Sequence, residues 1–223
     1  MRTVVFDLDG TLADTSGDLL AAANACFTDA GLEAPLLLDR DADTAVRGAR
    51  AMLKLGFERL HGPGDHTEAV DAHYRPLLEH YAADISTRTR FYDGALEAVA
   101  RLRAADLRCA ICTNKPGWLT EILLAEMGVP DAFDAVVCAD TLPVSKPDPA
   151  PFFEAVARAG GDPARALLIG DTQTDVSTAR AAGVPIVLVA FGPAGRSILD
   201  LDHDHVLERY SDLDALALRV LGD

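Results

Sequence analysis

The sequence predicts an α/β protein with a parallel β-sheet core, helices on both faces of the sheet and one all-helical insertion. Two observations support this prediction. Over most of the chain, short runs of β-branched and apolar residues alternate with longer segments of helical periodicity. The stretch 16–86 departs from this alternation, because it contains successive helical patterns and no convincing strand. Alternation of this kind indicates parallel strands covered on both faces, and the exception indicates a helical domain inserted into the core.

Five short apolar runs are expected to form the buried strands of the sheet. None shows the strict alternation with polar residues that marks a strand with one face in water. In chain order the runs are 3–8 (TVVFDL), 107–112 (LRCAIC), 135–138 (AVVC), 166–169 (ALLI) and 186–190 (IVLVA). A last core strand is expected after a surface turn at 202–205.

Helical patterns separate these strands. They cover 94–105, 118–127, 151–159 and 175–182. Gly128, Gly160 and Gly183 lie at or just beyond the ends of three of them, where glycine commonly terminates a helix. The core is therefore predicted to be Rossmann-like.

The insertion is expected to be a small bundle of helices over 17–30, 41–60 and 67–84. The predicted domain organisation is a catalytic core made of 1–15 and 87–223, with a helical cap made of 16–86. The two connections between core and cap are expected near 12–16 and 86–92.

Composition limits the classes of partner. The chain has 223 residues, with 20 Lys and Arg against 35 Asp and Glu, giving a formal charge of −15. Such a charge repels nucleic acid and anionic membrane surfaces. A small phosphorylated metabolite remains possible as a partner, because local cations and a divalent metal can hold it.

The chain has no signal-like opening segment and four scattered cysteines, which favours a reduced, cytoplasmic protein. Oligomeric state is not predicted.

Polar residues follow each strand at the end where parallel sheets gather their ligands. In chain order they are Asp7, Asp9, Thr113, Asn114, Lys146, Asp171 and Asp175. Taken singly, several have simpler explanations: Asp9-Gly10 resembles a hairpin turn, and Asp171 and Asp175 could cap the following helix. Their joint occurrence after successive strands is far more specific than any one of them.

Several carboxylates converging on one point would repel one another unless a cation lay among them, and hard oxygen ligands favour Mg²⁺. Thr113 and Lys146 would face the same point and could neutralise a phosphoryl group. A carboxylate could then attack phosphorus and form an aspartyl phosphate. The residues thus point to metal-assisted phosphoryl transfer.

These residues resemble the four motifs of the haloacid dehalogenase superfamily. The matching segments are Asp7-Leu8-Asp9-Gly10-Thr11, Thr113-Asn114-Lys115, Lys146-Pro147 and Gly170-Asp171 through Asp175. The resemblance spans nearly the whole chain, and TNKP, DTLPVSKPDP and GDTQTDVSTARAAGV are similar to the phosphoglycolate phosphatase branch. The inserted helices resemble the α-helical cap of that superfamily.

The resemblance implies a role for each residue. Asp7 would be the nucleophile and a metal ligand, and Asp9 the general acid and base, with its backbone carbonyl also on the metal. Asp171 would be the other metal ligand, with Asp175 orienting the metal site from outside the ligand set. Lys146, Thr113 and the Asn114 backbone would bind the phosphoryl group.

The function implied is Mg²⁺-dependent hydrolysis of a small phosphomonoester such as 2-phosphoglycolate. A phosphosugar mutase would keep the same motifs and is the alternative within enzymes. A phosphate or metal sensor is the alternative outside enzymes, since a fold alone does not prove activity.

In the expected cap, three cations are candidate contacts for a substrate carboxylate: Arg47, Arg50 and Lys54.

Overall fold

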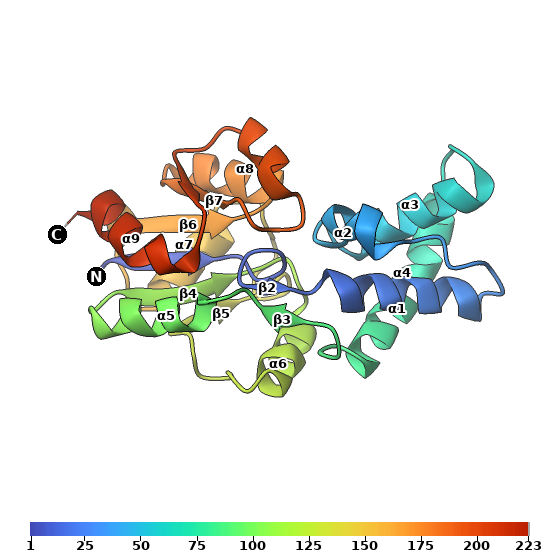
Figure 1. Cartoon of the computed structure of the whole chain (residues 1–223), viewed down its shortest axis with the longest axis horizontal. Coiled ribbons are helices and arrows are strands. Elements are labelled where there is room, and N and C mark those ends of the chain that lie inside the picture. The colour runs from blue at the N-terminus through green and yellow to red at the C-terminus, as the bar shows by residue number, and fades with distance from the viewer. Residues whose placement is uncertain (223) are drawn as a thin grey trace. The chain divides into compact units, whose positions relative to one another are not determined.

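The computed structural model describes residues 1–222, and a parallel sheet forms the centre of one of its two units (Figure 1). Within those residues the sheet has six strands in the order β5-β4-β1-β6-β7-β8, and all neighbouring pairs are parallel. The strands are β1 Thr3–Phe6, β4 Arg108–Cys112, β5 Ala135–Val137, β6 Ala166–Gly170, β7 Ile186–Val189 and β8 His205–Leu207. The predicted fold class is confirmed.

The central strand is β1, which pairs with β4 on one side and β6 on the other. Thr3 is in register with Arg108 and with Ala166. The chain adds β4 and β5 on one side of β1 and then crosses to β6, so the direction of strand addition reverses at β1. Ligands of open α/β sheets bind at the carboxyl ends of strands around such a reversal.

Helices cover both faces of the sheet because successive strand residues point to opposite sides. On one face, α7 (Ala150–Arg158) and α8 (Gln173–Ala182) bury Phe152 and Val176 against Val5 and Leu168. On the other face, α5 (Ala95–Ala104) contacts β4, and α9 (Leu213–Leu221) contacts β6 and α5. Helix α6 spans Gly117–Glu126, and short 3₁₀ turns cover Pro163–Arg165, Gly195–Asp200 and Tyr210–Asp212.

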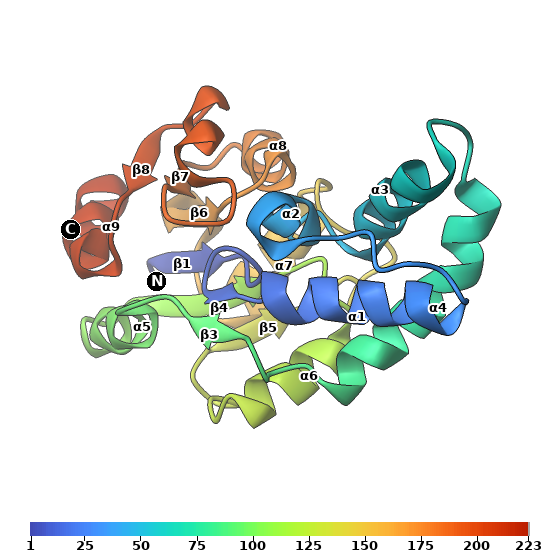
Figure 2. The ribbon, with the colours of Figure 1, turned by 45° about the vertical axis from the view of Figure 1, so that its right-hand side comes forward.

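The chain divides into two compact units. One contains Met1–Asp14 and the described residues from Phe91 onward, and the other contains Thr15–Arg90. The second unit is formed by α1 (Ser16–Asp29), α2 (Leu38–Ala45), α3 (Ala49–His61) and α4 (Thr67–Ala83), all labelled in Figure 2.

The helical unit has its own apolar interior. Phe27 of α1 and Phe57 of α3 pack edge to face, with ring centroids 5.1 Å apart. Leu77 and Tyr81 of α4 are fully buried in the same unit. The prediction of one helix over 41–60 is wrong, because α2 and α3 are separate helices. Gly48, at φ +96°, separates them in a conformation that other residues rarely adopt.

Two short segments connect the units and pair with each other as β2 (Ala13–Asp14) and β3 (Arg90–Phe91). At the start of α1, the buried carboxylate of Asp18 accepts hydrogen bonds from the backbone N–H groups of Arg88 and Thr89, at 2.8–3.0 Å. The beginning and end of the helical unit are thereby fixed to each other. No helix among residues 1–222 is long and apolar enough to cross a bilayer.

Candidate active site

Three buried carboxylates meet at the carboxyl ends of β1 and β6. Asp7 directly follows β1, Asp171 directly follows β6, and Asp175 lies in the first turn of α8. One oxygen from each lies within 4.8 Å of the others. The position of Asp175 is fixed by a capping box with Thr172, which precedes the helix.

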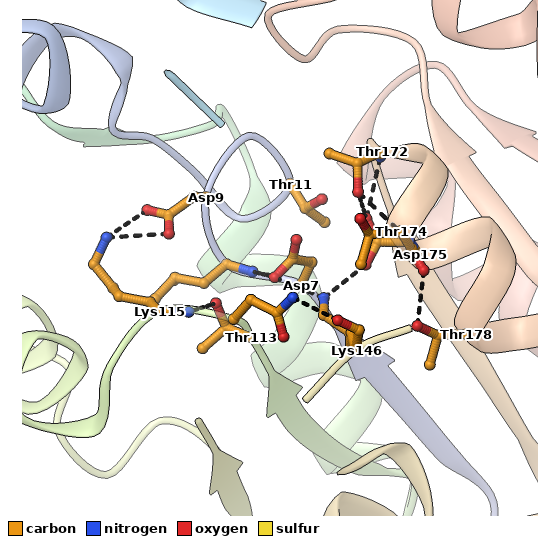
Figure 3. A network of polar contacts seen from close by, with 12 residues as sticks. Asp7, Asp9, Thr11, Thr113, Lys115, Lys146, Thr172, Thr174, Asp175 and Thr178 are labelled. Carbon is orange, nitrogen blue, oxygen red and sulfur yellow. Dashed lines mark hydrogen bonds and ion pairs between the residues drawn. The ribbon is translucent and has the colours of Figure 1, made fainter. Parts of the chain in front are cut away.

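A single ammonium group links two of these carboxylates. Lys146 Nζ lies 3.0 Å from Asp7 Oδ1 and donates a 2.7 Å hydrogen bond to Asp175 Oδ1 (Figure 3). Burial alone would lower the pKa of Lys146, but the charges of Asp175 and Asp7 outweigh it and raise the pKa. Lys146 is therefore a fixed positive charge beside Asp7.

The single positive charge of Lys146 does not neutralise the three carboxylates of the cluster. Burial raises the pKa of Asp7 to about 7, although Lys146 opposes the shift and Asp175 and Asp9 add to it. Burial, together with the charges of Asp7 and Asp175, also raises the pKa of Asp171 well above its usual range. Two acidic groups with raised pKa values beside a third carboxylate form a site that a further cation would stabilise.

Asp171 has one oxygen available to such a cation. Its Oδ1 accepts a 2.7 Å hydrogen bond from Thr11 Oγ1, whereas its buried Oδ2 has no hydrogen-bond partner among the described residues. Both oxygens of Asp175 are used, Oδ1 by Lys146 and Oδ2 by Thr172 at 2.7 Å. An unpaired buried carboxylate oxygen within an all-oxygen donor set fits a hard divalent ion such as Mg²⁺.

Thr113 and Asn114 follow β4, next to β1. The backbone N–H of Thr113 donates to Val137 O at 2.9 Å, and its hydroxyl accepts from the N–H of Lys115 at 3.1 Å. The side-chain amide of Asn114 donates to the backbone carbonyl of Lys146 at 2.8 Å. Asn114 thus holds the loop that carries the central lysine.

Asp9 lies apart from the three-carboxylate cluster. Its two oxygens face the ammonium of Lys115, at 2.8 and 3.1 Å. In Figure 3 this pair lies on one side of Asp7, and the contact between Lys146 and Asp175 lies on the other. The site therefore contains two buried lysines: Lys115 pairs with Asp9, and Lys146 pairs with Asp7 and Asp175.

Sequence reasoning did not assign roles to several residues that shape this site. Lys115 and Thr11 belong to the motif segments, but the sequence predicts no separate role for either of them. Tyr210 donates its hydroxyl to the backbone carbonyl of Thr11 at 2.7 Å across 199 positions of sequence. The position of Lys115 directly after Thr113-Asn114 was a usable signal, whereas nothing local marked Tyr210.

Two glycines permit close approaches around the carboxylates. A Cβ on Gly170 would lie 2.4 Å from Cβ of Asp175, and one on Gly192 would lie 2.8 Å from the carbonyl oxygen of Gly10. Both distances are below any normal contact. Gly170 and Gly192 are therefore required for β6, α8 and the loop after β1 to pack as they do.

Comparisons with known proteins agree on one family. A family model described as haloacid dehalogenase-like hydrolase matches residues 1–183. A phosphoglycolate phosphatase of Caulobacter vibrioides is 37% identical over 219 residues, covering 98% of this chain and 92% of that protein. One from Mesorhizobium japonicum is 38% identical over 215 residues, covering 94% and 92%.

The solved structures give the same fold. The crystal structure of a predicted phosphoglycolate phosphatase from Haemophilus somnus superposes with a TM-score of 0.82. It shares 24% sequence identity with this chain, and the match covers 97% of both chains. At that identity the likeness concerns the fold alone.

Proposed function

Because the chain belongs to the haloacid dehalogenase-like hydrolase family, we propose that it is a Mg²⁺-dependent phosphomonoesterase of small phosphorylated acids. The observation that carries the proposal is the environment of Asp7. Its carboxylate sits at the end of the central strand, 3.0 Å from the buried ammonium of Lys146 and within 4.8 Å of two further carboxylates. This arrangement supports Asp7 as the nucleophile, with Lys146 as a fixed cation beside it and the carboxylate cluster as the proposed cation site.

Asp7, Asp171 and the backbone carbonyl of Asp9 are the proposed Mg²⁺ ligands. The unpaired Oδ2 of Asp171 supports this assignment, as do the raised pKa values of Asp7 and Asp171. When bound, the ion would offset the charge of the carboxylates and of the phosphoryl oxygens. Asp175, whose oxygens are already hydrogen-bonded, would orient Lys146 and the loop after β6.

The proposed reaction proceeds in two displacements. A carboxylate oxygen of Asp7 attacks phosphorus, the bond from phosphorus to the ester oxygen breaks, and Asp9 donates a proton to that oxygen. Water then attacks phosphorus and gives a proton to Asp9, and the bond to Asp7 breaks to release inorganic phosphate. Lys146, Thr113 and the Asn114 backbone N–H would hold the phosphoryl oxygens throughout.

The names of the two relatives support phosphoglycolate as the substrate. Their identity of 37–38% extends over more than nine-tenths of each protein, including the helical insertion. We propose the unit Thr15–Arg90 as the cap domain of this chain.

Turnover of a panel of phosphomonoesters, assayed for inorganic phosphate with Mg²⁺ and with EDTA, tests the proposal. We expect Mg²⁺-dependent phosphate release, fastest for 2-phosphoglycolate. Conversion of a sugar phosphate to its isomer without phosphate release would instead identify a mutase. Binding without turnover of any ester would identify a sensor.

A further inference from the structure

Lys146 points inward from a loop that is otherwise exposed around it. The segment 138–149 joins β5 to α7 and contains turns and bends but no helix or strand. Residues 143–145 and 147–148, on either side of Lys146, are exposed, whereas the side chain of Lys146 is only 2% exposed. The inward direction of this side chain therefore does not follow from burial of the whole loop. It depends on contacts that Lys146 itself makes.

The two ends of Lys146 are held by different partners. At the end of the side chain, Nζ lies 3.0 Å from Asp7 Oδ1 and 2.7 Å from Asp175 Oδ1 (Figure 3). At the backbone, the carbonyl oxygen of Lys146 accepts a 2.8 Å hydrogen bond from the side-chain amide of Asn114. The ammonium can bridge both carboxylates only while the backbone stays within the length of the side chain. The hydrogen bond from Asn114 opposes movement of that backbone away from the site.

Asn114 is attached to a fixed part of the sheet. It follows β4, and the residues before and after it are hydrogen-bonded to β5 and its continuation. The N–H of Thr113 donates to the carbonyl of Val137 at 2.9 Å, and the carbonyl of Lys115 accepts from the N–H of Ala139 at 3.1 Å. The side chain of Asn114 thus ties the loop of the central lysine to the edge of the sheet. An amide donor suits this task, because the partner is a carbonyl acceptor.

We infer that the side chain of Asn114 is a positioning residue that sets the place of the Lys146 ammonium between Asp7 and Asp175. The inference rests on the proposed function and deepens it, because there only the backbone N–H of Asn114 contacts the phosphoryl group. The side chain acts instead through Lys146, whose charge would face the phosphoryl oxygens. Electrostatic stabilisation of this kind depends on a charge held in place before the reaction begins.

Nuclear magnetic resonance of the lysine ammonium groups tests the inference without any substrate. A buried, ion-paired ammonium should exchange its protons slowly with water, and Lys146→Arg assigns the signal by removing it. We expect Asn114→Ala to shift this signal and to speed its hydrogen exchange by about threefold to tenfold, the range expected for the loss of one hydrogen bond. Asn114→Leu, which keeps the branched shape without the donor, should have the same effect.

Turnover gives the second readout. We expect kcat/KM for 2-phosphoglycolate with Mg²⁺ to fall by about threefold to tenfold in Asn114→Ala and in Asn114→Leu. Both variants keep the backbone N–H, so the phosphoryl contact proposed for that group is retained. Asn24→Ala is the matched control, because Asn24 of α1 also donates its side-chain amide to a backbone carbonyl, that of Leu36, at 2.8 Å. It should change neither the Lys146 signal nor kcat/KM.

Three results would overturn the inference. The first is an unchanged Lys146 signal in both Asn114 variants, since the side chain would then act elsewhere or not at all. The second is an equal shift in Asn24→Ala, which would indicate a general loss of stability. The third is the absence of a slowly exchanging Lys146 ammonium in the unmodified protein, because the charge would then not be held in place.

The two proposals fail in different ways. If the unmodified protein releases no phosphate from any ester, the proposed function fails, while the ammonium signal still decides whether Asn114 positions Lys146. If the signal responds to the Asn114 variants but kcat/KM does not, the contact exists without a role in the reaction and the inference fails alone. If Asn114→Ala does not fold, as judged by circular dichroism, Asn114→Leu makes the same comparison.

Discussion

At the scale of single residues, the two aspartates of the first loop have different surroundings. Asp7 contacts Lys146 inside the carboxylate cluster, and Asp9 contacts Lys115 beside it. The difference matches the different tasks proposed for them, since a nucleophile must face phosphorus permanently and an acid must approach the leaving group. Removing either carboxylate should therefore stop turnover for a different reason.

We expect both Asp7→Asn and Asp9→Asn to abolish phosphate release. With an activated aryl phosphate, whose leaving group needs no proton, Asp9→Asn should still accumulate phosphoenzyme, because its nucleophile is intact. Asp7→Asn should accumulate none. Acid quenching with ³²P-labelled ester and counting of protein-bound label measures this, and label on the Asp7→Asn protein would disprove the nucleophile assignment.

The free oxygen of Asp171 leads to a prediction about the metal. Asp171→Ala removes a proposed ligand, whereas Thr113→Ala removes a hydroxyl proposed for the phosphoryl group. We expect the apparent Mg²⁺ affinity to fall by about tenfold or more in Asp171→Ala and by far less in Thr113→Ala. Calorimetric Mg²⁺ titration without substrate measures the difference directly. Equal shifts in the two variants would argue against the assigned roles.

At the scale of elements, α1 and α3 of the helical unit approach closely because Gly56 has no side chain. A Cβ at this position would lie 2.2 Å from the ring of Phe27. We expect Gly56→Ala to destabilise the protein by about 1–3 kcal/mol, although alanine has the higher helix propensity, because overpacking outweighs the propensity gain. Urea unfolding measures the change.

Gly64 provides a matched control for that substitution. Its nearest neighbouring heavy atom is 4.0 Å from a constructed Cβ. Gly64→Ala should leave the free energy of unfolding within about 0.5 kcal/mol of the original value. If the two variants behave alike, the contact between Gly56 and Phe27 does not limit the packing of α1 and α3.

Helices α2 and α3 are also joined by an ion pair that gives a pH dependence. Both carboxylate oxygens of buried Asp41 accept hydrogen bonds from Arg59, at 2.5 Å each. Hydrogen bonding to Arg59 lowers the pKa of Asp41 below its usual value. Asp41 therefore binds its proton less tightly in the folded protein than in the unfolded chain. The ion pair stabilises the folded protein above about pH 4, near the unfolded pKa of Asp. This stabilisation is lost as the pH falls through the folded pKa of Asp41.

We expect Asp41→Asn to lower the free energy of unfolding by about 2 kcal/mol at pH 7, with the difference from the original protein narrowing below pH 4. Asp43→Asn is the control, because Asp43 is on the same helix as Asp41 but its ion pair with Arg47 is exposed. It should change stability by less than about 0.5 kcal/mol. A loss for Asp41→Asn that does not vary with pH would show that charge is not responsible.

At the scale of the whole molecule, a residue distant in sequence supports the loop that follows β1. Tyr210 is buried, packs against Phe191 with ring centroids 5.2 Å apart, and donates its hydroxyl to the carbonyl of Thr11. Thr11 in turn donates to Asp171. Tyr210, which lies beyond the 1–183 range of the family model, is thus linked through Thr11 to Asp171 of the proposed metal site.

We expect Tyr210→Phe, which removes only the hydroxyl, to reduce stability by about 1 kcal/mol and to weaken Mg²⁺ binding by a few fold. Thermal unfolding and Mg²⁺ calorimetry measure the two effects. A loss of stability with unchanged Mg²⁺ affinity would show that Tyr210 supports the fold without acting on Asp171.

The sequence alone determined the fold class, the family and the position of each acidic motif after its strand. The family follows from the resemblance of the motifs. The fold class and the motif positions follow from local properties, because periodicity depends on neighbouring residues and parallel strands bring their carboxyl ends to one edge of the sheet. The break between α2 and α3 was missed, because the apolar periodicity continues across Gly48 while the backbone there turns.

Tertiary structure alone decided which polar group each side chain contacts. Lys115 pairs with Asp9 across 106 positions, Asn114 binds the carbonyl of Lys146, and Tyr210 binds that of Thr11. Motif spacing places these residues near one another, but a contact at hydrogen-bond distance depends on strand register and on the packing of every intervening element. The sequence could therefore locate the candidate site, whereas the pairing of Lys115 with Asp9 became visible only in the folded chain.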